Sequence, residues 1–264
     1  MVAAGGSPTV RVGIDIGSVA TKAVLVDGGK ILGKALVKTG PDVQKSAEAV
    51  FGQALDLSGI SVSDVGRIVS TGYGRRLFNK ADQVITEISA AATGAYLLAE
   101  GQECTILDVG GQDTKVIEVD KAGEVIDFMM NDKCAAGTGR FLEIMAEVLG
   151  ADFEGISRLA LKSKNPVTIN STCSVFAESE VISLLASATP KEDIAAGLFI
   201  AISTRIFNML RQFNLNKTLV FCGGGAMSRA LKDGLEKVTG CSFQVPENPQ
   251  FVTAYGAAMS KIKS

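Results

Sequence analysis

An internal repeat constrains the fold of this chain more than any other feature of its sequence. Residues 12–27 read VGIDIGSVATKAVLVD, and residues 106–120 read ILDVGGQDTKVIEVD. The offset between aligned positions is constant (108 − 15 = 93 and 115 − 22 = 93). The aligned pairs are Asp15 and Asp108, Gly17 and Gly110, Thr21 and Thr114, Lys22 and Lys115, and Asp27 and Asp120. We therefore predict that the chain contains the same structural unit twice.

Each copy is predicted to form a small β-sheet that is followed by helices. An apolar strand reaches Asp-x-Gly, turns and continues as a second strand, and a third strand is predicted at residues 30–37 and 125–130. Helices are predicted at residues 43–57, 139–149, 175–186, 194–213 and 252–263, and short strands at 219–222 and 243–245. The predicted fold class is α/β, with two duplicated lobes and a cleft between them.

Composition excludes several classes of function. The 26 basic and 28 acidic residues give a net charge of −2, and no cluster of Lys or Arg offers a face for nucleic acid. The sequence has no His, so a His-activated nucleophile and a His-ligated metal site are both excluded. Residues 1–8 lack the basic start of a signal peptide, and the longest apolar stretch, 194–202, is too short to span a bilayer. We expect a cytoplasmic protein.

The Asp-x-Gly turns are candidate phosphate sites. Gly17 lets the backbone approach a phosphate, Lys22 adds a point charge, and Asp15 is suited to hold Mg²⁺ directly or through water. Most hairpins of this kind bind nothing. Two copies in register favour binding, because an ordinary hairpin does not need an Asp at the buried end of an apolar strand.

A third glycine-rich element follows the apolar segment 219–222. Gly223, Gly224 and Gly225 lie between a predicted strand and a helix, where a bare backbone can lie close to a flat ligand. Alone, this segment is best explained as a simple connection. Together with two phosphate turns upstream, it is better explained as a loop that contacts adenosine.

These three motifs, in this order, resemble the actin, sugar-kinase and heat-shock ATPase superfamily. The resemblance implies that segments 15–22 and 108–113 face each other across a nucleotide cleft around ATP. It implies lobe I at residues 1–100, to which a C-terminal helix within 248–264 returns, and lobe II at residues 101–247. The implied phosphate-binding residues are Gly17, Ser18, Thr21, Lys22, Gly110 and Gly111. The candidate catalytic residues are Asp15, Gln112 and Asp113, the last two as groups that orient a water.

The five cysteines fall into two groups. Cys104, Cys222 and Cys241 lie in or beside short apolar segments, where core packing is expected. Cys134 and Cys173 lie in polar or small-residue segments just before predicted helices, where unpaired N–H groups favour an anion. Their spacing alone matches no ligand pattern, so incidental loop cysteines remain an alternative. Two such ligands complete a four-thiolate [4Fe–4S] site only in a twofold dimer.

Two longer strings carry a more specific resemblance. Residues 131–142 (NDKCAAGTGRFL) and 171–181 (STCSVFAESEV) resemble the cysteine motifs of ATP-dependent activators of 2-hydroxyacyl-CoA dehydratases, and of the related benzoyl-CoA reductase ATPase subunits. Residues 70–75 (STGYGR) and 108–113 (DVGGQD) match as well. The resemblance implies a homodimer with one [4Fe–4S] cluster between the subunits, held by Cys134 and Cys173 of each chain. Gly137, Thr138 and Gly139 would link the cluster to the adenosine end of the cleft.

The function implied by this resemblance is ATP-dependent electron transfer. Ferredoxin or flavodoxin would reduce the cluster, and one electron would then pass to a dehydratase or reductase component with its own iron–sulfur cluster. Val19 and Thr253 depart from the family's usual motifs, which leaves the partner enzyme open. The alternatives are another double-cubane-cluster reductase as partner, a small-molecule kinase of the same fold, or a regulatory ATPase.

Overall fold

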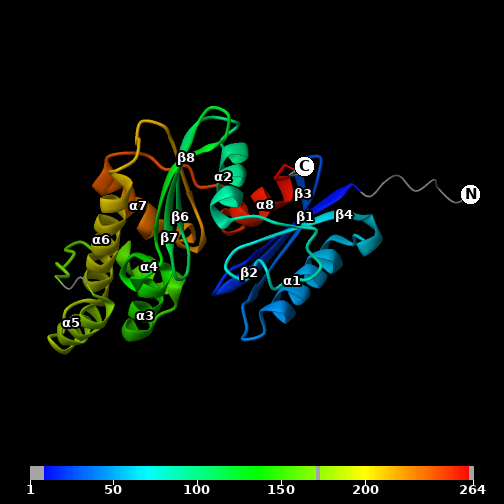
Figure 1. Ribbon diagram of the computed structural model, residues 1–264. Coiled ribbons are helices and arrows are strands. Elements are labelled where there is room, and N and C mark those ends of the chain that lie inside the picture. The colour runs from blue at the N-terminus through cyan, green and yellow to red at the C-terminus, as the bar shows by residue number, and fades with distance from the viewer. Residues whose placement is uncertain (1–8, 171–172, 262–264) are drawn as a thin grey trace, which may run out of the picture. The chain divides into compact units, whose positions relative to one another are not determined.

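The computed structural model describes residues 9–170 and 173–261, and the chain forms two compact units (Figure 1). The first unit comprises the chain up to Glu103, the segment Val119–Val125 and the chain from Phe251 onward. The second comprises Cys104–Glu118 and Ile126–Gln250. The segment predicted not to be a signal peptide, 1–8, lies outside the described residues, as do positions 171 and 172 of the second cysteine motif.

The first unit is built on a five-stranded sheet of order β3-β2-β1-β4-β5. Its strands are β1 (Val10–Ile16), β2 (Ala20–Asp27), β3 (Lys30–Lys38), β4 (Val65–Thr71) and β5 (Gln83–Val84). The first three form an antiparallel meander, and β4 pairs with β1 in parallel. The helices are α1 (Val43–Ser58), η1 (Val62–Asp64), α2 (Glu87–Leu98) and α8 (Val252–Met259).

The strand period decides which helix covers which face of this sheet. Along β2, Ala23 and Leu25 belong to the cluster packed on α1, whereas Val24 and Val26 pack against α8. Helix α8 lies very close to the sheet, since a Cβ on Gly13 of β1 would clash with the Ala254 carbonyl oxygen. Small residues in α8 make this approach possible, and they also let α8 pack on α2.

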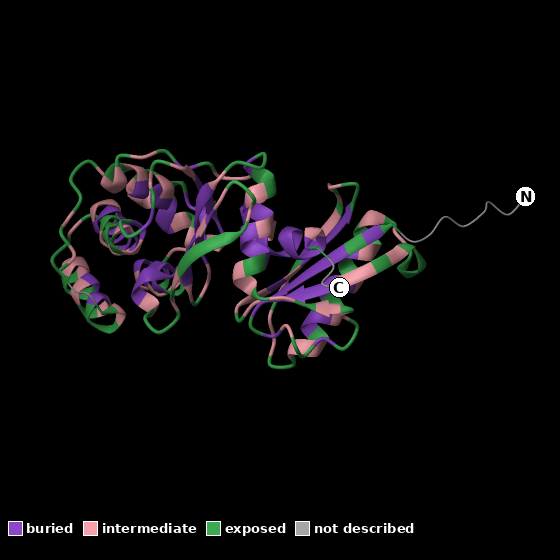
Figure 2. Ribbon diagram, turned by 45° about the horizontal axis from the view of Figure 1, so that its top comes forward, coloured by how far each residue is buried: buried purple, intermediate pink, exposed green. Residues whose placement is uncertain are grey.

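The second unit repeats this design with a four-stranded sheet of order β8-β7-β6-β9. Its strands are β6 (Cys104–Val109), β7 (Thr114–Val119), β8 (Val125–Asn131) and β9 (Thr218–Cys222). Strand β7 is antiparallel to β6, whereas β9 is parallel to it, as β4 is to β1. Figure 2 shows that the central strands are buried, while the edge strand β8 is largely exposed. The predicted α/β class and its duplication are confirmed.

The other described elements belong to the second unit, except that η4 crosses into the first unit at Phe251. They are η2 (Ala135–Gly137), α3 (Gly139–Leu149), α4 (Phe153–Ala160), α5 (Ser174–Ala186), α6 (Lys191–Leu210), η3 (Gly224–Met227), α7 (Arg229–Thr239) and η4 (Pro249–Phe251). Of the described helices, α6 is long and apolar enough to cross a membrane, but more than half of it is buried against its own unit. Because it packs on α4 and α7, it is a core helix.

Some predicted boundaries were wrong. The helix predicted at 194–213 begins at Lys191, directly after Pro190 as N-cap, and ends at Leu210. The strand predicted at 243–245 is an extended segment with one isolated parallel bridge, Val220 to Gln244. The final helix ends at Met259, earlier than the predicted 263.

Candidate functional site

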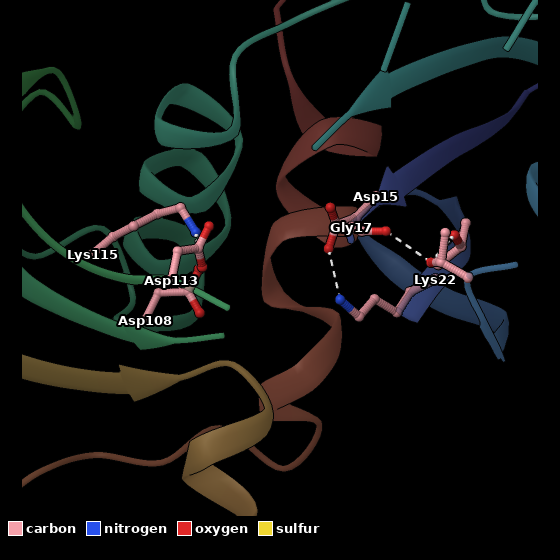
Figure 3. Close-up of polar contacts among 8 residues, drawn as sticks. Asp15, Gly17, Lys22, Asp108, Asp113 and Lys115 are labelled. Carbon is pink, nitrogen blue, oxygen red and sulfur yellow. Dashed lines mark hydrogen bonds and ion pairs between the residues drawn. The ribbon is translucent and has the colours of Figure 1, made fainter. Parts of the chain in front are cut away.

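The first Asp-x-Gly turn connects β1 to β2 in the first unit. Ile14 and Ile16 face α1, so the alternation of β1 turns Asp15 toward the other face of the sheet, where it is buried. Antiparallel pairing sets Lys22 opposite Asp15, and Lys22 Nζ lies 3.1 Å from Asp15 Oδ2 (Figure 3). A Cβ on Gly17 would lie 2.8 Å from the Ala20 carbonyl oxygen, so this turn requires glycine.

Two hydroxyl groups hold the backbone of this first turn. Thr39 Oγ1 donates to the Gly17 carbonyl oxygen at 2.8 Å, and it lies 2.8 Å from Thr21 Oγ1. Thr21 is fully buried, whereas Ser18 is exposed. The predicted phosphate-site residue Thr21 therefore stabilises the turn from its buried side, and Ser18 lies on the solvent-exposed side of the turn.

Two buried oxygens beside this turn lack hydrogen-bond partners within the described residues. They are Asp15 Oδ1 and Thr71 Oγ1, and the parallel register of β1 and β4 sets Asp15 opposite Thr71. Buried polar atoms are nearly always satisfied, by protein or by something bound. A carboxylate oxygen with a free lone pair suits Mg²⁺, which prefers oxygen ligands and keeps several waters. Asp15 thus fits the predicted magnesium role, and Thr71 is a neighbour that the sequence did not single out.

The second turn connects β6 to β7 and carries a different polar set. Lys115 is 1% exposed, and its Nζ lies 2.7 Å from Asp113 Oδ1 and 3.9 Å from Asp108 Oδ2 (Figure 3). The Gly110 N–H donates to the Asp113 carbonyl oxygen at 2.9 Å, and Gln112 is exposed. The position of Asp113 is taken by Ala20 in the first copy, so this carboxylate belongs to the second turn alone.

The glycine loop after β9 has a counterpart after β4. Gly223 has φ +82°, and a Cβ there would clash with Asp108 Oδ1. Gly72, with φ +89°, would bring a Cβ within 2.6 Å of Asp15 Oδ1. Only glycine readily adopts such φ values so close to another backbone. The segment 70–75, to which the sequence alone assigns no role, is therefore the first unit's version of the Gly223–Gly225 loop.

The structure separates the cysteines as predicted. Cys134 and Cys173 are exposed, while Cys104 and Cys222 are buried and Cys241 is half-buried. Burial raises the pKa of Cys104 to about 11. Burial, and next the charge of Asp108, raises the pKa of Cys222 well above its usual value. Burial therefore favours the protonated, unreactive form of these two thiols.

Each exposed cysteine precedes a helical segment. Cys173 is the N-cap of α5, and its carbonyl accepts from the Ala177 N–H at 2.9 Å. Cys134 is the N-cap of the three-residue helix η2, and α3 begins only at Gly139. The Asn131 side chain holds the Cys134 backbone, since Nδ2 donates to the Cys134 carbonyl at 2.9 Å and Oδ1 accepts from its N–H at 3.2 Å.

Three hydrogen bonds join the segment after Cys134 to the second turn. The N–H of Gly139 donates to the Gly110 carbonyl at 2.9 Å, and the N–H of Arg140 donates to the Gly111 carbonyl at 2.8 Å. Thr114 Oγ1 donates to the Gly137 carbonyl at 2.6 Å. The candidate phosphate turn and the candidate cysteine ligand are thus connected by short, direct contacts within one unit.

Within residues 9–170 and 173–261, no three Cys, Asp or Glu side chains are grouped so that they could hold a metal ion. The two exposed thiols of one chain would supply half of the ligands that a four-thiolate cluster needs. The donor type fits an iron–sulfur cluster, and the number fits one cluster shared by two chains.

Comparison with known proteins agrees with this geometry. A model of the BadF/BadG/BcrA/BcrD ATPase family matches residues 12–260. The 2-hydroxyisocaproyl-CoA dehydratase activator of Clostridioides difficile is 36% identical over 94% of this chain and 92% of that protein. These matches confirm the resemblance expected from the cysteine motifs.

Solved structures match over nearly the full chain. (R)-2-hydroxyglutaryl-CoA dehydratase component A of Acidaminococcus fermentans is 37% identical, with a TM-score of 0.91 over 95% of this chain and 96% of that chain. The Clostridium difficile activator with bound ADPNP is 36% identical, with a TM-score of 0.91 over 95% and 93%. A ROK family glucokinase from Streptomyces griseus, 14% identical with a TM-score of 0.60 over 95% and 98%, shares the fold alone.

Proposed function

Because the chain belongs to the BadF/BadG/BcrA/BcrD ATPase family, we propose that it is an ATP-driven activator that passes a low-potential electron to a 2-hydroxyacyl-CoA dehydratase or a related reductase component. One observation carries the electron-transfer part. Cys134 and Cys173 are exposed before helical segments, while Cys104 and Cys222 are sealed in the core. Two such ligands per chain give four in a homodimer, which is the number that a [4Fe–4S] cluster requires.

We assign ATP to the duplicated turns and the glycine loop. In the first unit, Gly17, Ser18 and Lys22 bind phosphate oxygens, supported by the buried Thr21. Asp15 holds Mg²⁺, which would neutralise phosphate charge, and its unpartnered Oδ1 supports this role.

The second unit supplies the remaining nucleotide contacts. Gly110 and Gly111 offer backbone groups to phosphate, and the loop Gly223–Gly225 contacts adenosine. Asp113, oriented by its 2.7 Å contact with Lys115, accepts a proton from the attacking water or orients it, and the exposed Gln112 assists.

Coupling between nucleotide and cluster follows from the contacts that join the second turn to the cysteine segment. A movement of Gly110 or Gly111 on nucleotide binding shifts the start of α3 through their hydrogen bonds, and a movement of Thr114 shifts Gly137 in the same way. The cluster would store the single electron that leaves the protein. Gly137, Thr138 and Gly139 therefore transmit a nucleotide-dependent shift toward Cys134.

The partners of this cycle are proposed on the same basis. A ferredoxin or flavodoxin reduces the cluster in the cytoplasm, and a dehydratase or reductase component with its own iron–sulfur cluster accepts the electron. Relatives of this chain include the activator of lactoyl-CoA dehydratase from Anaerotignum propionicum and a subunit of benzoyl-CoA reductase from Thauera aromatica. Either kind of acceptor fits the electron-transfer role.

The test is anaerobic purification of the wild type beside Cys134→Ala, Cys173→Ala and Cys241→Ala. We expect roughly four irons per dimer in the wild type and the Cys241→Ala control, and loss of iron in the other two variants. ATP turnover is measured on every sample. An iron-free wild type that still hydrolyses ATP would contradict the electron-transfer proposal and favour a kinase or a regulatory ATPase.

A further inference from the structure

Arg205 lies in the core helix α6 and reaches toward the segment that carries Cys134. Its Nη1 donates to the Ala136 carbonyl oxygen at 2.9 Å, and its guanidinium carbon lies 5.7 Å from the centre of the buried Phe141 ring. The side chain is half-buried. A long cationic side chain is thus fixed at two points, by η2 and by α3, which both follow the first exposed cysteine in the chain.

Both exposed cysteines act on this guanidinium. Burial lowers the pKa of Arg205, and the charges of Cys134 and Cys173 raise it. The two cysteines come from separate segments of the chain, before η2 and before α5, so the fold brings a single cation within electrostatic reach of both.

We propose that Arg205 is a positioning residue that raises the reduction potential of the cluster held by Cys134 and Cys173, an inference that rests on the proposed function. A cluster with four thiolate ligands is anionic, and its reduction adds one electron and one negative charge. A fixed cation nearby stabilises the more negative, reduced form more than the oxidised form. In a homodimer the effect comes from two copies of Arg205.

The chemistry of this side chain matches the role. Half-burial penalises an arginine unless charge and hydrogen bonds compensate it. The contact with Ala136 and the stacking on Phe141 account for part of this compensation, and they fix the position of the charge. The simpler alternative is that Arg205 only secures the Ala136 carbonyl. The two roles differ in one respect, because only the first makes the potential depend on the charge at position 205.

The experiment compares three variants of the anaerobically prepared, cluster-loaded dimer. Arg205→Gln keeps a hydrogen-bond donor but removes the charge, and Arg205→Lys keeps the charge. Arg211→Gln removes an exposed cation just after the last residue of the same helix and serves as the matched control. Each protein is titrated against a one-electron mediator while the reduced cluster is followed by electron paramagnetic resonance, and iron is measured in parallel.

We expect Arg205→Gln to shift the one-electron equilibrium about tenfold toward the oxidised cluster, a potential about 59 mV more negative. Arg205→Lys should stay within about threefold of the wild type, about 30 mV, and Arg211→Gln should not differ from it. An unchanged potential in iron-loaded Arg205→Gln, or an equal shift in Arg205→Lys, would overturn the inference.

Iron content separates the remaining outcomes. If Arg205→Gln holds too little iron to titrate, Arg205→Lys is compared with Arg205→Ala. If Arg205→Lys retains iron and Arg205→Ala does not, the result supports a role for the charge. Equal loss of iron in these two variants overturns the inference. An iron-free wild type overturns the proposed function itself, and with it this inference.

Discussion

Replacing Thr114 by valine removes a buried hydrogen bond between the second turn and the cysteine segment while keeping the shape of the side chain. Thr114 Oγ1 donates to the Gly137 carbonyl at 2.6 Å, and both residues are buried. Leaving a buried carbonyl without its donor costs about 1–3 kcal/mol. We expect the free energy of unfolding to fall by this amount, and the thermal midpoint to fall by about 2–4 °C for each kcal/mol.

The same change should weaken the response of Cys134 to nucleotide. We expect a non-hydrolysable ATP analogue to alter the rate at which Cys134 is alkylated in the iron-free wild type. If the bond contributes about 1–2 kcal/mol to the coupling, Thr114→Val reduces this change about 5- to 30-fold. The measurement is the alkylation rate at Cys134, followed by mass spectrometry with and without the analogue.

Thr105→Val is the matched control. Thr105 lies on the adjacent strand β6, is 1% exposed, and donates through Oγ1 to the Asn214 carbonyl at 2.9 Å. It should lose similar stability and keep the full nucleotide response. The reasoning is refuted if Thr114→Val responds to nucleotide as the wild type does, or if Thr105→Val loses as much of the response.

Three further outcomes are expected. Gly223→Ala should lower the thermal midpoint much more than Gly240→Ala. Both glycines have positive φ, but only at Gly223 would the new Cβ have other atoms within 4 Å. Equal losses of thermal midpoint would contradict the steric argument. Lys115→Met removes the cation at 2.7 Å from Asp113 and should cost about 2–3 kcal/mol in chemical denaturation, whereas a variant as stable as the wild type would show that the pair contributes nothing. Burial raises the pKa of Cys104 from 9.0 to about 11, so its contribution to stability is complete below pH 9 and is lost as the pH rises toward 11. In Cys104→Val the unfolding midpoint should fall less steeply with pH between 9 and 11 than in the wild type. An equal slope in both proteins would contradict this contribution of Cys104.

Much of the fold followed from local patterns. The helix predicted at residues 139–149 is α3 to the residue, and the third strands predicted at 30–37 and 125–130 each end one residue later, at Lys38 and Asn131. Strand period and turn residues repeat in both copies, and each copy therefore supports the prediction for the other.

The elements that the sequence did not reveal depend on distant partners. Strand β4 pairs with β1 in parallel, so no hairpin turn in the sequence indicates where it begins. Helices α2 and α4 received no prediction, although α2 packs directly on α8. Segment 243–245 has two apolar residues beside Gln244, but it makes only an isolated bridge beside β9.

The candidate site shows the same division. The sequence identified three glycines of the candidate site, Gly17, Gly110 and Gly223, because a tight turn requires glycine at a particular position in the chain. Thr71 lies within the matching string 70–75 but received no role, and Arg205 was not identified because nothing adjacent in the sequence marks it. Each becomes relevant only where a second strand or helix brings it against a polar group.

The sequence by itself determined the duplication and the residues of the turns. It also separated two cysteines, Cys134 and Cys173, from the other three. These features depend on residue type and short spacing. Only the tertiary structure decided that Gly110 and Gly111 bind the start of α3, and that Arg205 of α6 donates to the carbonyl of Ala136 in the segment after Cys134. The physical reason is that such contacts are set by which faces of distant elements pack together. That choice is made by the burial of the whole core and is not encoded in any single segment.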